Sequence, residues 1–412
     1  MTIDDARDAV TPPQGLAAAR PAAAIPAWRG LVVFVVREAA AHQIDEAVAG
    51  IARGLEILDV VELDAAQRAA ARTGLTGADW GPGGKPVPGG GPHTFVIACD
   101  VAPPVGVVHG VRSMAERIDE VRARTTHRLL HTLPPQQHYE PLHVSTGPQQ
   151  ALDFLEVLGD LDVQARLLPR VTALIEACSV PFPLVRMLAP DSPGYRARVA
   201  LVDHPVHGRS VCKIFRPGAL EFFRRELSAR QELADLPEVP ELLEHGPNWL
   251  LTPFYTDVGR HLVRPLSGVK EMHQLRPDVV RQLARFARDL HERGKFVLDL
   301  SPHNLMWDAH AGLKVLDLEF VLDYPGPVPP FEECWSLHGV PSELRRVGDG
   351  LPDLMLTKGV GNSVFHPAVS GLPPESLFSP PRRGETVRRT ATQLAWYAGL
   401  AVAGRVHPAM RR

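Results

Sequence analysis

Three short apolar runs, separated by polar residues, stand out between Lys295 and Phe320 in this chain of 412 residues. The first run leads into Asp299, a loop then ends at Asn304, and two further runs joined by a turn lead to Asp317. Apolar runs of this length, bounded by turn residues, indicate buried strands. The pattern therefore predicts a strand, a loop and a hairpin that hold three polar side chains at strand ends, where a rigid scaffold typically presents its chemistry.

The preceding residues predict a strand with a lysine at its centre and two helices. Lys213 stands between apolar neighbours in SVCKIF, where a buried ammonium group is costly unless an acid pairs with it. Glu226 follows thirteen residues later in a helix predicted over 218–233, and Glu221 is the rival partner. The alternative is a lysine that keeps an edge strand soluble. The second helix, over 279–294, is amphipathic, ends at a glycine and leads into the first apolar run.

The spacing of the three polar residues resembles that of the protein-kinase-like superfamily: Asn304 follows Asp299 by five residues, and Asp317 follows Asn304 by thirteen. The resemblance covers residues 182–330. It implies a bilobal phosphotransferase that uses ATP and Mg²⁺, in which Asp299 orients the attacking hydroxyl while Asn304 and Asp317 bind the metal. Lys213 and its partner would neutralise the ATP phosphates. Taken singly, the three polar residues would be turn formers or strand-end caps.

The same resemblance implies a glycine-rich loop at the phosphates and a strand end at the adenine. This sequence has only part of the first. Where the superfamily has a glycine-rich loop, the segment APDSPGYRAR has one glycine, Gly194. Arg196 and Arg198 in this segment either supply positive charge to the phosphates or form a solvated strand face. The adenine would meet the backbone of three residues at the end of an apolar strand: Pro253, Phe254 and Tyr255.

The sequence after Asp317 departs from the superfamily pattern. Glu319 replaces the glycine of Asp-Phe-Gly, and it would either add a second carboxylate at the metal site or point at solvent. A proline-rich run replaces the long activation segment that peptide substrates need, which favours a small-molecule, sugar or lipid-linked acceptor; residues 358–362 form a candidate substrate loop. The alternative function is a pseudokinase that acts as a nucleotide-sensing regulatory module. The altered motifs favour it, whereas the retained lysine, asparagine and two aspartates favour the enzyme.

The first part of the chain alternates apolar strands with helical patterns. The elements follow one another as strand, helix, strand, strand, helix, strand and helix. This order predicts a ferredoxin-like α/β sandwich. The segment GPGGKPVPGGGP at 81–92 lacks the helix that follows a phosphate-binding loop, and it is predicted as a flexible connector. The predicted strands are 31–36, 55–63, 94–99 and 140–144, and the predicted helices are 44–53, 111–130 and 148–158.

Residues 30–160 resemble a nucleoside diphosphate kinase in two segments, LVVFVVREAAAHQIDEAVAGIARGLEILDVVEL and LHVSTGPQQALDFL. In that family the second segment carries the histidine that is phosphorylated, and His143 occupies this position. Arg37 and Glu38 replace the family's lysine and proline, so the resemblance implies a degenerate module. Two hypotheses stay open: His143 retains phosphotransfer, or it is a partly buried strand histidine satisfied by a hydrogen bond.

Composition sets the remaining limits. The net charge of −3 gives no basis for a general nucleic-acid partner. Four widely spaced cysteines and the lack of a long apolar run predict a cytoplasmic protein without a transmembrane segment. We therefore expect an α+β protein with a flexible leader (1–28), the sandwich (29–162), a helical connector (163–182), a kinase-like N-lobe (183–258) and a C-lobe with a loop-rich extension (259–412). The connector helix is predicted to place Ala165, Leu168, Thr172 and Ile175 on one face.

Overall fold

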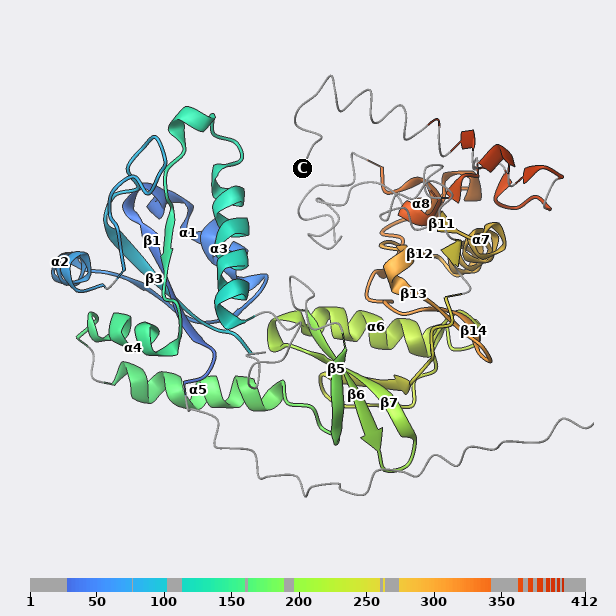
Figure 1. Cartoon of the computed structure of the whole chain (residues 1–412), viewed down its shortest axis with the longest axis horizontal. Helices are drawn as coiled ribbons and strands as arrows, with labels where there is room; N and C mark the ends of the chain where they lie inside the picture. Colours follow the sequence, from blue (N-terminus) through green and yellow to red (C-terminus); the bar gives the residue numbers. More distant parts are fainter. Residues whose placement is uncertain are drawn as a thin grey trace, which may run out of the picture.

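The computed structural model describes residues 28–341, except 76, 102–112, 160–161, 189–195, 260–261 and 264–273, and also parts of 362–395. These residues form a sheet-based N-terminal unit (28–177), a small lobe (184–253) and a large lobe (262–365). The N-terminal unit lies beside the small lobe, and the large lobe lies on the other side of helix α6 (Figure 1). The predicted leader up to residue 27 lies outside the described residues, as do residues 358–361 of the candidate substrate loop.

Four antiparallel strands form the sheet of the N-terminal unit, in the order β2-β3-β1-β4. β1 lies inside the sheet, paired with β3 on one side and with β4 on the other. All seven of its residues are buried, because both faces of the sheet are covered. The strands are β1 (Leu31–Arg37), β2 (Glu56–Glu62), β3 (Pro92–Cys99) and β4 (Leu142–Val144).

Alternate residues of β1 face two different layers of helices, as the two-residue repeat of a strand requires. Its even-numbered apolar residues pack against α1 and α3, and its odd-numbered ones pack against α2, α4 and α5. The first layer consists of α1 (Ile44–Ala52) and α3 (Met114–Leu130), and the second of α2 (Ala65–Gly74), α4 (Pro148–Glu156) and α5 (Val163–Ala177).

Helix α2 is absent from the sequence-based prediction, although the sequence carries a signal for it. Asp64 accepts a hydrogen bond from the Gln67 N–H at 2.8 Å, and the Gln67 side chain accepts one from the Asp64 N–H at 3.0 Å. This reciprocal pair is a capping box, which marks the start of a helix. The connection after β2 therefore contains a helix, and the next strand begins at Pro92 rather than Thr94.

Helix α5 is present as the predicted connector, but it buries a different face. Val163, Leu167 and Val171 are at most 2% exposed and pack against the odd-numbered face of β1. Of the predicted face, Ala165 and Thr172 are exposed, whereas Ile175 is partly buried against the same core. The three buried residues are spaced by four, so they lie on one side of the helix.

The small lobe is a five-stranded antiparallel sheet in the order β5-β6-β7-β9-β8, with α6 (Leu220–Glu232) beside it. Helix α6 buries Phe223 and Ala229, but it also buries Glu226 and Arg230. Buried charges are stable only when they are paired, so this helix already points to an ionic cluster. The strands are β5 (Leu184–Leu188), β6 (Ala197–His204), β7 (Gly208–Phe215), β8 (Glu244–His245) and β9 (Trp249–Pro253).

The large lobe is built on α7 (Pro277–Glu292), whose predicted apolar face is confirmed, because Val279, Leu283, Phe286 and Leu290 are all 0% exposed. After this helix β12 pairs with β15, and β13 pairs with β14 as the predicted hairpin. No helix among the described residues is long and apolar enough to cross a membrane. The remaining elements are β10 (Leu262–Val263), β11 (Gln274–Leu275), β12 (Lys295–Val297), β13 (Leu305–Asp308), β14 (Gly312–Val315), β15 (Val321–Asp323) and α8 (Trp335–His338).

A buried ion pair joins the small lobe to the N-terminal unit. Arg216 follows β7, and its guanidinium group donates to Glu56 at 2.6 Å and to the carbonyl oxygens of Ala52 and Arg53 at the end of α1. Glu56 also accepts a hydrogen bond at 2.9 Å from the N–H of Gly218, where the chain turns into α6. Arg216 is 6% exposed and Glu56 is 8% exposed. The position of α6 is therefore tied to the N-terminal unit.

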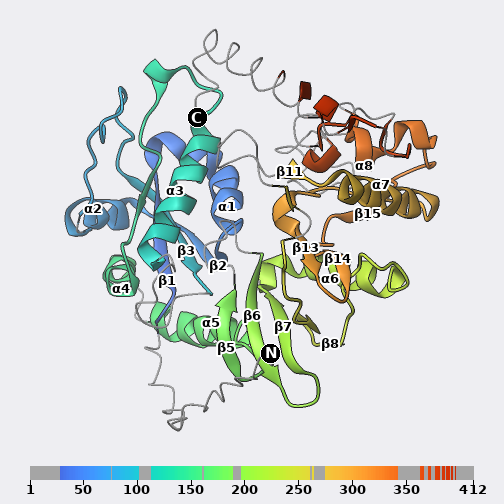
Figure 2. The ribbon, with the colours of Figure 1, turned by 45° about the vertical axis from the view of Figure 1, so that its right-hand side comes forward.

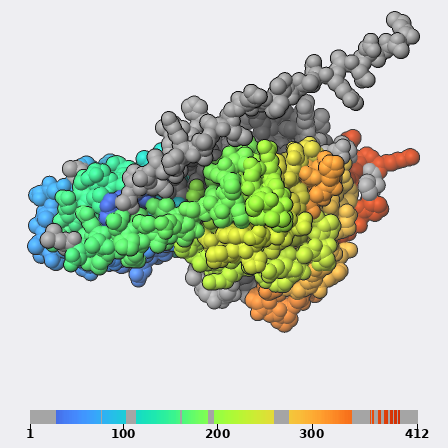
Figure 3. All heavy atoms as spheres, turned by 90° about the horizontal axis from the view of Figure 1, so that it is seen from below, coloured from blue at the N-terminus to red at the C-terminus, as the bar shows by residue number. Residues whose placement is uncertain are grey.

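A second contact between these parts lies at the end of α5. Asn248 and Arg198 of the small lobe donate to the carbonyl oxygens of Ala177 at 2.8 Å and Cys178 at 3.1 Å. Such bonds satisfy carbonyl groups that have no partner within the helix. The atoms of α5 abut those of the small lobe in the view from below (Figure 3), and the two parts also stay together in the turned view (Figure 2).

The ion pair can be tested by a pair of substitutions on β2. Glu56→Ala should lower the free energy of unfolding by about 3 kcal/mol, because the Arg216 guanidinium then stays buried without its acid. Glu62→Ala is the matched control: this side chain is 69% exposed and pairs with Arg68 on the surface, so a loss below about 1 kcal/mol is expected. Urea titration measures both values, and equal losses would contradict a structural role for Glu56.

Candidate active site

Asp299 has a backbone conformation that few residues other than glycine adopt. Its φ is +65°, and no other non-glycine residue of the described chain has a positive φ. Aspartate tolerates this region better than most residues, and such strained positions concentrate at functional sites. The Asn304 amide donates to the Asp299 carbonyl oxygen at 2.9 Å, and the Leu298 N–H donates to the Phe320 carbonyl oxygen at 3.1 Å. The loop is therefore held at both ends.

Asn362 supports the same loop from a distant part of the sequence. Its Oδ1 accepts from the Leu300 N–H at 2.7 Å, and its Nδ2 donates to the carbonyl oxygens of Val297 and Ser336 at 2.8 and 2.7 Å. The residue is 4% exposed. Its place at the end of the candidate substrate loop suggested contact with an acceptor, but its buried amide instead fixes the backbone next to Asp299. No local pattern in the sequence announces this support.

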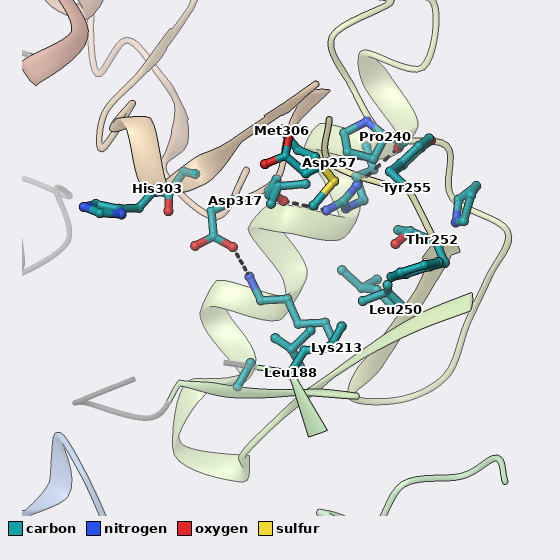
Figure 4. A pocket seen from close by; sticks show the side chains of 18 of the residues that line it. Leu188, Lys213, Pro240, Leu250, Thr252, Tyr255, Asp257, His303, Met306 and Asp317 are labelled. Carbon is teal, nitrogen blue, oxygen red and sulfur yellow. Dashed lines mark hydrogen bonds and ion pairs between the residues drawn. The ribbon is translucent and has the colours of Figure 1, made fainter. Parts of the chain in front are cut away.

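Lys213 reaches from β7 into a group of three carboxylates. Its Nζ donates to Glu226 at 2.6 Å and to Asp317 at 2.7 Å, and it lies 3.6 Å from Glu319. Glu226 is the partner expected from the sequence, whereas Glu221 is exposed and pairs within its own helix. Because Glu226 belongs to the small lobe and Asp317 to the large lobe, Lys213 bridges the two (Figure 4).

The charged groups of this cluster shift one another's pKa values. Burial lowers the pKa of Lys213, but Asp317, Glu226 and Glu319 raise it by more, so the pKa lies above its usual value. Burial raises the pKa of Asp317, but the charge and the hydrogen bond of Lys213 outweigh this effect, so the pKa lies below its usual value. Lys213 and Asp317 are therefore both charged at neutral pH.

Arg230 belongs to the cluster, and the sequence reasoning missed it. Its Nη2 donates to Glu226 at 2.6 Å and to the Leu316 carbonyl oxygen at 2.8 Å, and its Nη1 donates to the Pro240 carbonyl oxygen at 3.2 Å. It is 5% exposed. The arginine ties α6 to the strand end that carries Asp317. Its spacing of four residues from Glu226 on one helix is the signal that could have found it.

A cavity of about 690 Å³ opens between the lobes beside Lys213 and Asp317. Its lining includes Asn304 and the three residues expected to meet an adenine, Pro253, Phe254 and Tyr255. The His303 side chain points away from Lys213 and Asp317 (Figure 4). Gly194 lies outside the described residues. Apolar walls are formed by Leu188, Val199, Val211 and Leu250 from the small lobe and by Met306 and Leu316 from the large lobe. An apolar slot with a charged end suits a ligand with a flat base and an anionic tail.

Glu319 is buried rather than pointed at solvent. It is 2% exposed, and it accepts a hydrogen bond from Arg196 Nε at 2.6 Å. The Arg196 guanidinium carbon also lies 5.0 Å from the centre of the Phe222 ring and 4.9 Å from that of Phe320. The sequence left two alternatives for Arg196 and Arg198: positive charge for the phosphates, or a solvated strand face. The second alternative is wrong for Arg196, because its guanidinium group is paired and packed against aromatic rings. Arg198 instead contacts the end of α5.

The predicted flexible connector is packed against the sheet of the N-terminal unit. Arg37, at the end of β1, is 1% exposed, and it donates to the carbonyl oxygens of Gly81 and Gly90 at 2.9 Å and of Asp79 at 3.3 Å. At Gly89 an added Cβ would lie 2.2 Å from a backbone oxygen, so only glycine fits. A buried guanidinium group thus takes its hydrogen-bond partners from the two ends of this loop, whereas residues 82–84 and 86–88 between them are exposed, so the flexibility of that middle part stays a prediction.

His143 lies on β4 between two aromatic side chains. Its ring stacks on Phe154 at 5.7 Å and meets Trp80 edge-on at 5.9 Å. Its Nε2 is buried without a hydrogen-bond partner, so the hydrogen bond expected for a structural strand histidine is absent at this atom. Burial, together with Arg37 and Arg122, lowers the pKa of His143 to about 4. The ring is therefore neutral at physiological pH.

One group in the described chain combines three residues of metal-ligand type: His204, His207 and Glu244. The Nδ1 of His204 accepts hydrogen bonds from the N–H groups of Val206 and His207, both at 3.2 Å. The ring proton must then be on Nε2, which faces Glu244 at 3.2 Å. A ring that accepts at one nitrogen and donates from the other has no lone pair for a metal, so this group is a hydrogen-bonded turn.

Residues 188–295 match the family model of the phosphotransferase enzyme family. The match begins at the end of β5 and reaches the start of β12, so it includes Lys213, Glu226 and the residues beside the cavity at the end of β9. It ends before Asp299. A search of curated proteins finds no match to the chain. The match supports a kinase-like phosphotransferase domain in the C-terminal half.

The pKa of His143 makes stability depend on pH. An unfolded histidine has a pKa near 6.5, so between about pH 6.5 and pH 4 the unfolded chain binds the proton more readily, and stability falls as the pH falls. His143→Phe keeps an aromatic ring and removes this titration. From pH 7 to pH 5 the wild type should lose about 1 to 2 kcal/mol more unfolding free energy than the variant. Urea titration at both pH values measures this, and parallel losses would contradict it.

Proposed function

We propose that this chain is an ATP- and Mg²⁺-dependent phosphotransferase of protein-kinase-like fold, which transfers the γ-phosphoryl group of ATP to a hydroxyl group of a small-molecule, sugar or lipid-linked acceptor. The observation that carries the proposal is the contact of Lys213 with both Glu226 and Asp317 at the edge of an apolar cavity. The same lysine, helix glutamate and metal-binding aspartate define the active arrangement of protein kinases. The family match supports the coarser part, a phosphotransferase.

The donor atoms at this end of the cavity suit a magnesium ion. Asp317 offers carboxylate oxygens and Asn304 an amide oxygen, which are ligand types that Mg²⁺ prefers. The amide nitrogen of Asn304 is used by the Asp299 carbonyl oxygen, which leaves the amide oxygen as its ligand atom. When bound, the ion would neutralise charge on the phosphates. Glu319 is held by Arg196, so it is not included among the ligands.

The remaining roles follow from the positions of the side chains. Lys213 has three donor hydrogens, so it would keep Glu226 while it donates to phosphate oxygens in place of Asp317. Pro253, Phe254 and Tyr255 would contact the adenine through their backbone groups. Asp299, on the loop beside Asn304, would orient the acceptor hydroxyl and take its proton. The strained backbone of Asp299 and the buried support from Asn362 both favour such a role.

A small acceptor is favoured by the short connection after Asp317. Strand β15 begins at Val321, and its neighbour β12 leads directly into the loop of Asp299. After this strand, a proline-rich stretch leads to α8 in place of the long segment on which a peptide would lie. The competing function, a pseudokinase, is favoured by the presence of a single glycine in the segment before Arg196. We propose a cytoplasmic location and no nucleic-acid partner, as the composition indicates.

We further propose that the N-terminal unit is a degenerate nucleoside-diphosphate-kinase-like module of ferredoxin-like topology. The strand order β2-β3-β1-β4, with α1 and α3 on one face, supports this proposal. His143 lies on β4, where the resemblance expects the phosphorylated histidine. The packing of its ring against Trp80 and Phe154 and the packed loop over Arg37 favour a structural role, whereas the unpartnered Nε2 does not, so phosphotransfer through His143 stays a prediction.

Nucleotide binding can be separated from its metal dependence by thermal unfolding. ATP should raise the melting temperature of the wild type, and MgCl₂ should increase this shift, because ligands that bind the folded state stabilise it. Asp317→Asn should keep a shift with ATP alone but lose the increment from MgCl₂. A wild type with no shift in either condition would contradict the nucleotide site, and an unchanged increment in the variant would contradict the metal role of Asp317.

Catalysis can be tested with ATP labelled at its γ-phosphate and a metabolite or glycan extract as the source of acceptors. Asp299→Ala should lower the rate of label transfer by about 100-fold or more, in line with the loss of a general base. Asp323→Asn is the matched control, because its carboxylate is 78% exposed at the end of β15. Full activity of Asp299→Ala would refute the assignment, and binding without transfer by the wild type would favour the pseudokinase.

A further inference from the structure

Three arginines line the nucleotide cavity besides Lys213, and the proposed function does not use the one at position 196. Arg196 lines the cavity together with Lys213 and Asp317. It stands at the start of β6, where kinase-like proteins lead out of their glycine-rich loop. In this sequence the segment before β6 has one glycine, so it has few of the residues that let backbone amides approach phosphate closely. A side chain at this place would supply the missing positive charge.

Arg196 is held by contacts that fix its guanidinium plane. Its Nε donates to Glu319 at 2.6 Å, and its Nη2 contacts the same carboxylate. The rings of Phe222 and Phe320 lie within 5.0 Å of its guanidinium carbon. Arginine carries donors on more than one edge of its plane. The contacts to Glu319 use Nε and one N–H of Nη2, so further N–H groups on Nη1 and Nη2 can donate to a ligand in the cavity.

The charges around Lys213 also require a further cation. Lys213 and Arg230 are positive, while Glu226, Asp317 and Glu319 are negative, so these five groups alone carry a net charge of −1. By itself, such a group gives a polyphosphate no net electrostatic attraction. Arg196 brings the sum to zero before any metal ion is added, and it does so on the cavity wall, next to Lys213.

We propose that Arg196 is a phosphate-binding residue of the nucleotide site and that Glu319 is the residue that positions it. This inference rests on the proposed function and deepens it: the site would distinguish nucleoside diphosphates and triphosphates from nucleosides by an anchored arginine side chain. Glu319, which replaces the glycine of Asp-Phe-Gly, then has a defined task. The competing explanation is that the pair of Arg196 and Glu319 only holds the small lobe against the large lobe.

The experiment is calorimetric titration of the full-length chain with adenosine, AMP, ADP and ATP. Arg196→Ala should lower the affinity for ADP and ATP by about 10-fold to 100-fold, as expected for a lost hydrogen bond to a charged group. The affinity for adenosine should not change. Arg196→Lys should bind ADP and ATP with affinities between those of the wild type and of Arg196→Ala, because lysine keeps the positive charge but lacks the planar guanidinium group. Arg198→Ala is the matched control, since Arg198 lies on the same strand but contacts Cys178 outside the cavity.

Glu319 is tested by a double-mutant cycle on ADP affinity. If Glu319 positions Arg196, Arg196→Ala should lower the ADP affinity less in the Glu319→Gln variant than in the wild type. Additive effects would overturn the positioning role. A loss in Arg196→Ala that is equal for adenosine and ADP would overturn the phosphate contact in favour of a lobe-to-lobe contact, and an unchanged ADP affinity would also overturn it. A wild type that binds none of the four ligands would overturn the proposed function itself.

Discussion

The central constraint in this structure is the burial of one ammonium group among three carboxylates. Lys213 is 14% exposed and Glu226 is fully buried, so both side chains need ion-pair partners inside the protein. The contact of Lys213 with Asp317 extends this requirement across the cleft, because the two residues belong to different lobes. Arg230 adds a further bond from α6 to the strand end before Asp317. The two lobes therefore meet at the charges that the proposed reaction uses.

The N-terminal unit contributes to the same arrangement from the other end of α6. Glu56 accepts a hydrogen bond from Gly218 and pairs with Arg216, so it holds the chain where it enters this helix. Glu226 follows about two turns later on the same helix. The position of Glu226 thus depends on contacts at both ends of the helix, one to the N-terminal unit and one to the large lobe. This gives the N-terminal unit a structural role that does not require chemistry at His143.

The parts of the fold with strong local patterns could be predicted from the sequence. The buried stripe of α7, the hairpin of β13 and β14 and the pairing of Lys213 with Glu226 all follow from apolar spacing or from the cost of an unpaired charge. Contacts between distant segments could not be predicted in this way. Asn362 and Glu56 act through tertiary contacts that no local pattern encodes. The contacts of this loop with Arg37 could not be predicted for the same reason, since they come from a buried residue on another strand. The role of each site residue stays a prediction.

The central claim is that Lys213 exchanges Asp317 for the phosphates of a nucleotide while it keeps Glu226. A crystal structure of the full-length chain with Mg²⁺ and a non-hydrolysable ATP analogue tests this most directly. The account predicts the phosphates at Lys213, the metal between Asp317 and Asn304, and the base against the strand end at Pro253. An analogue bound elsewhere, with the contact between Lys213 and Asp317 intact, would contradict it.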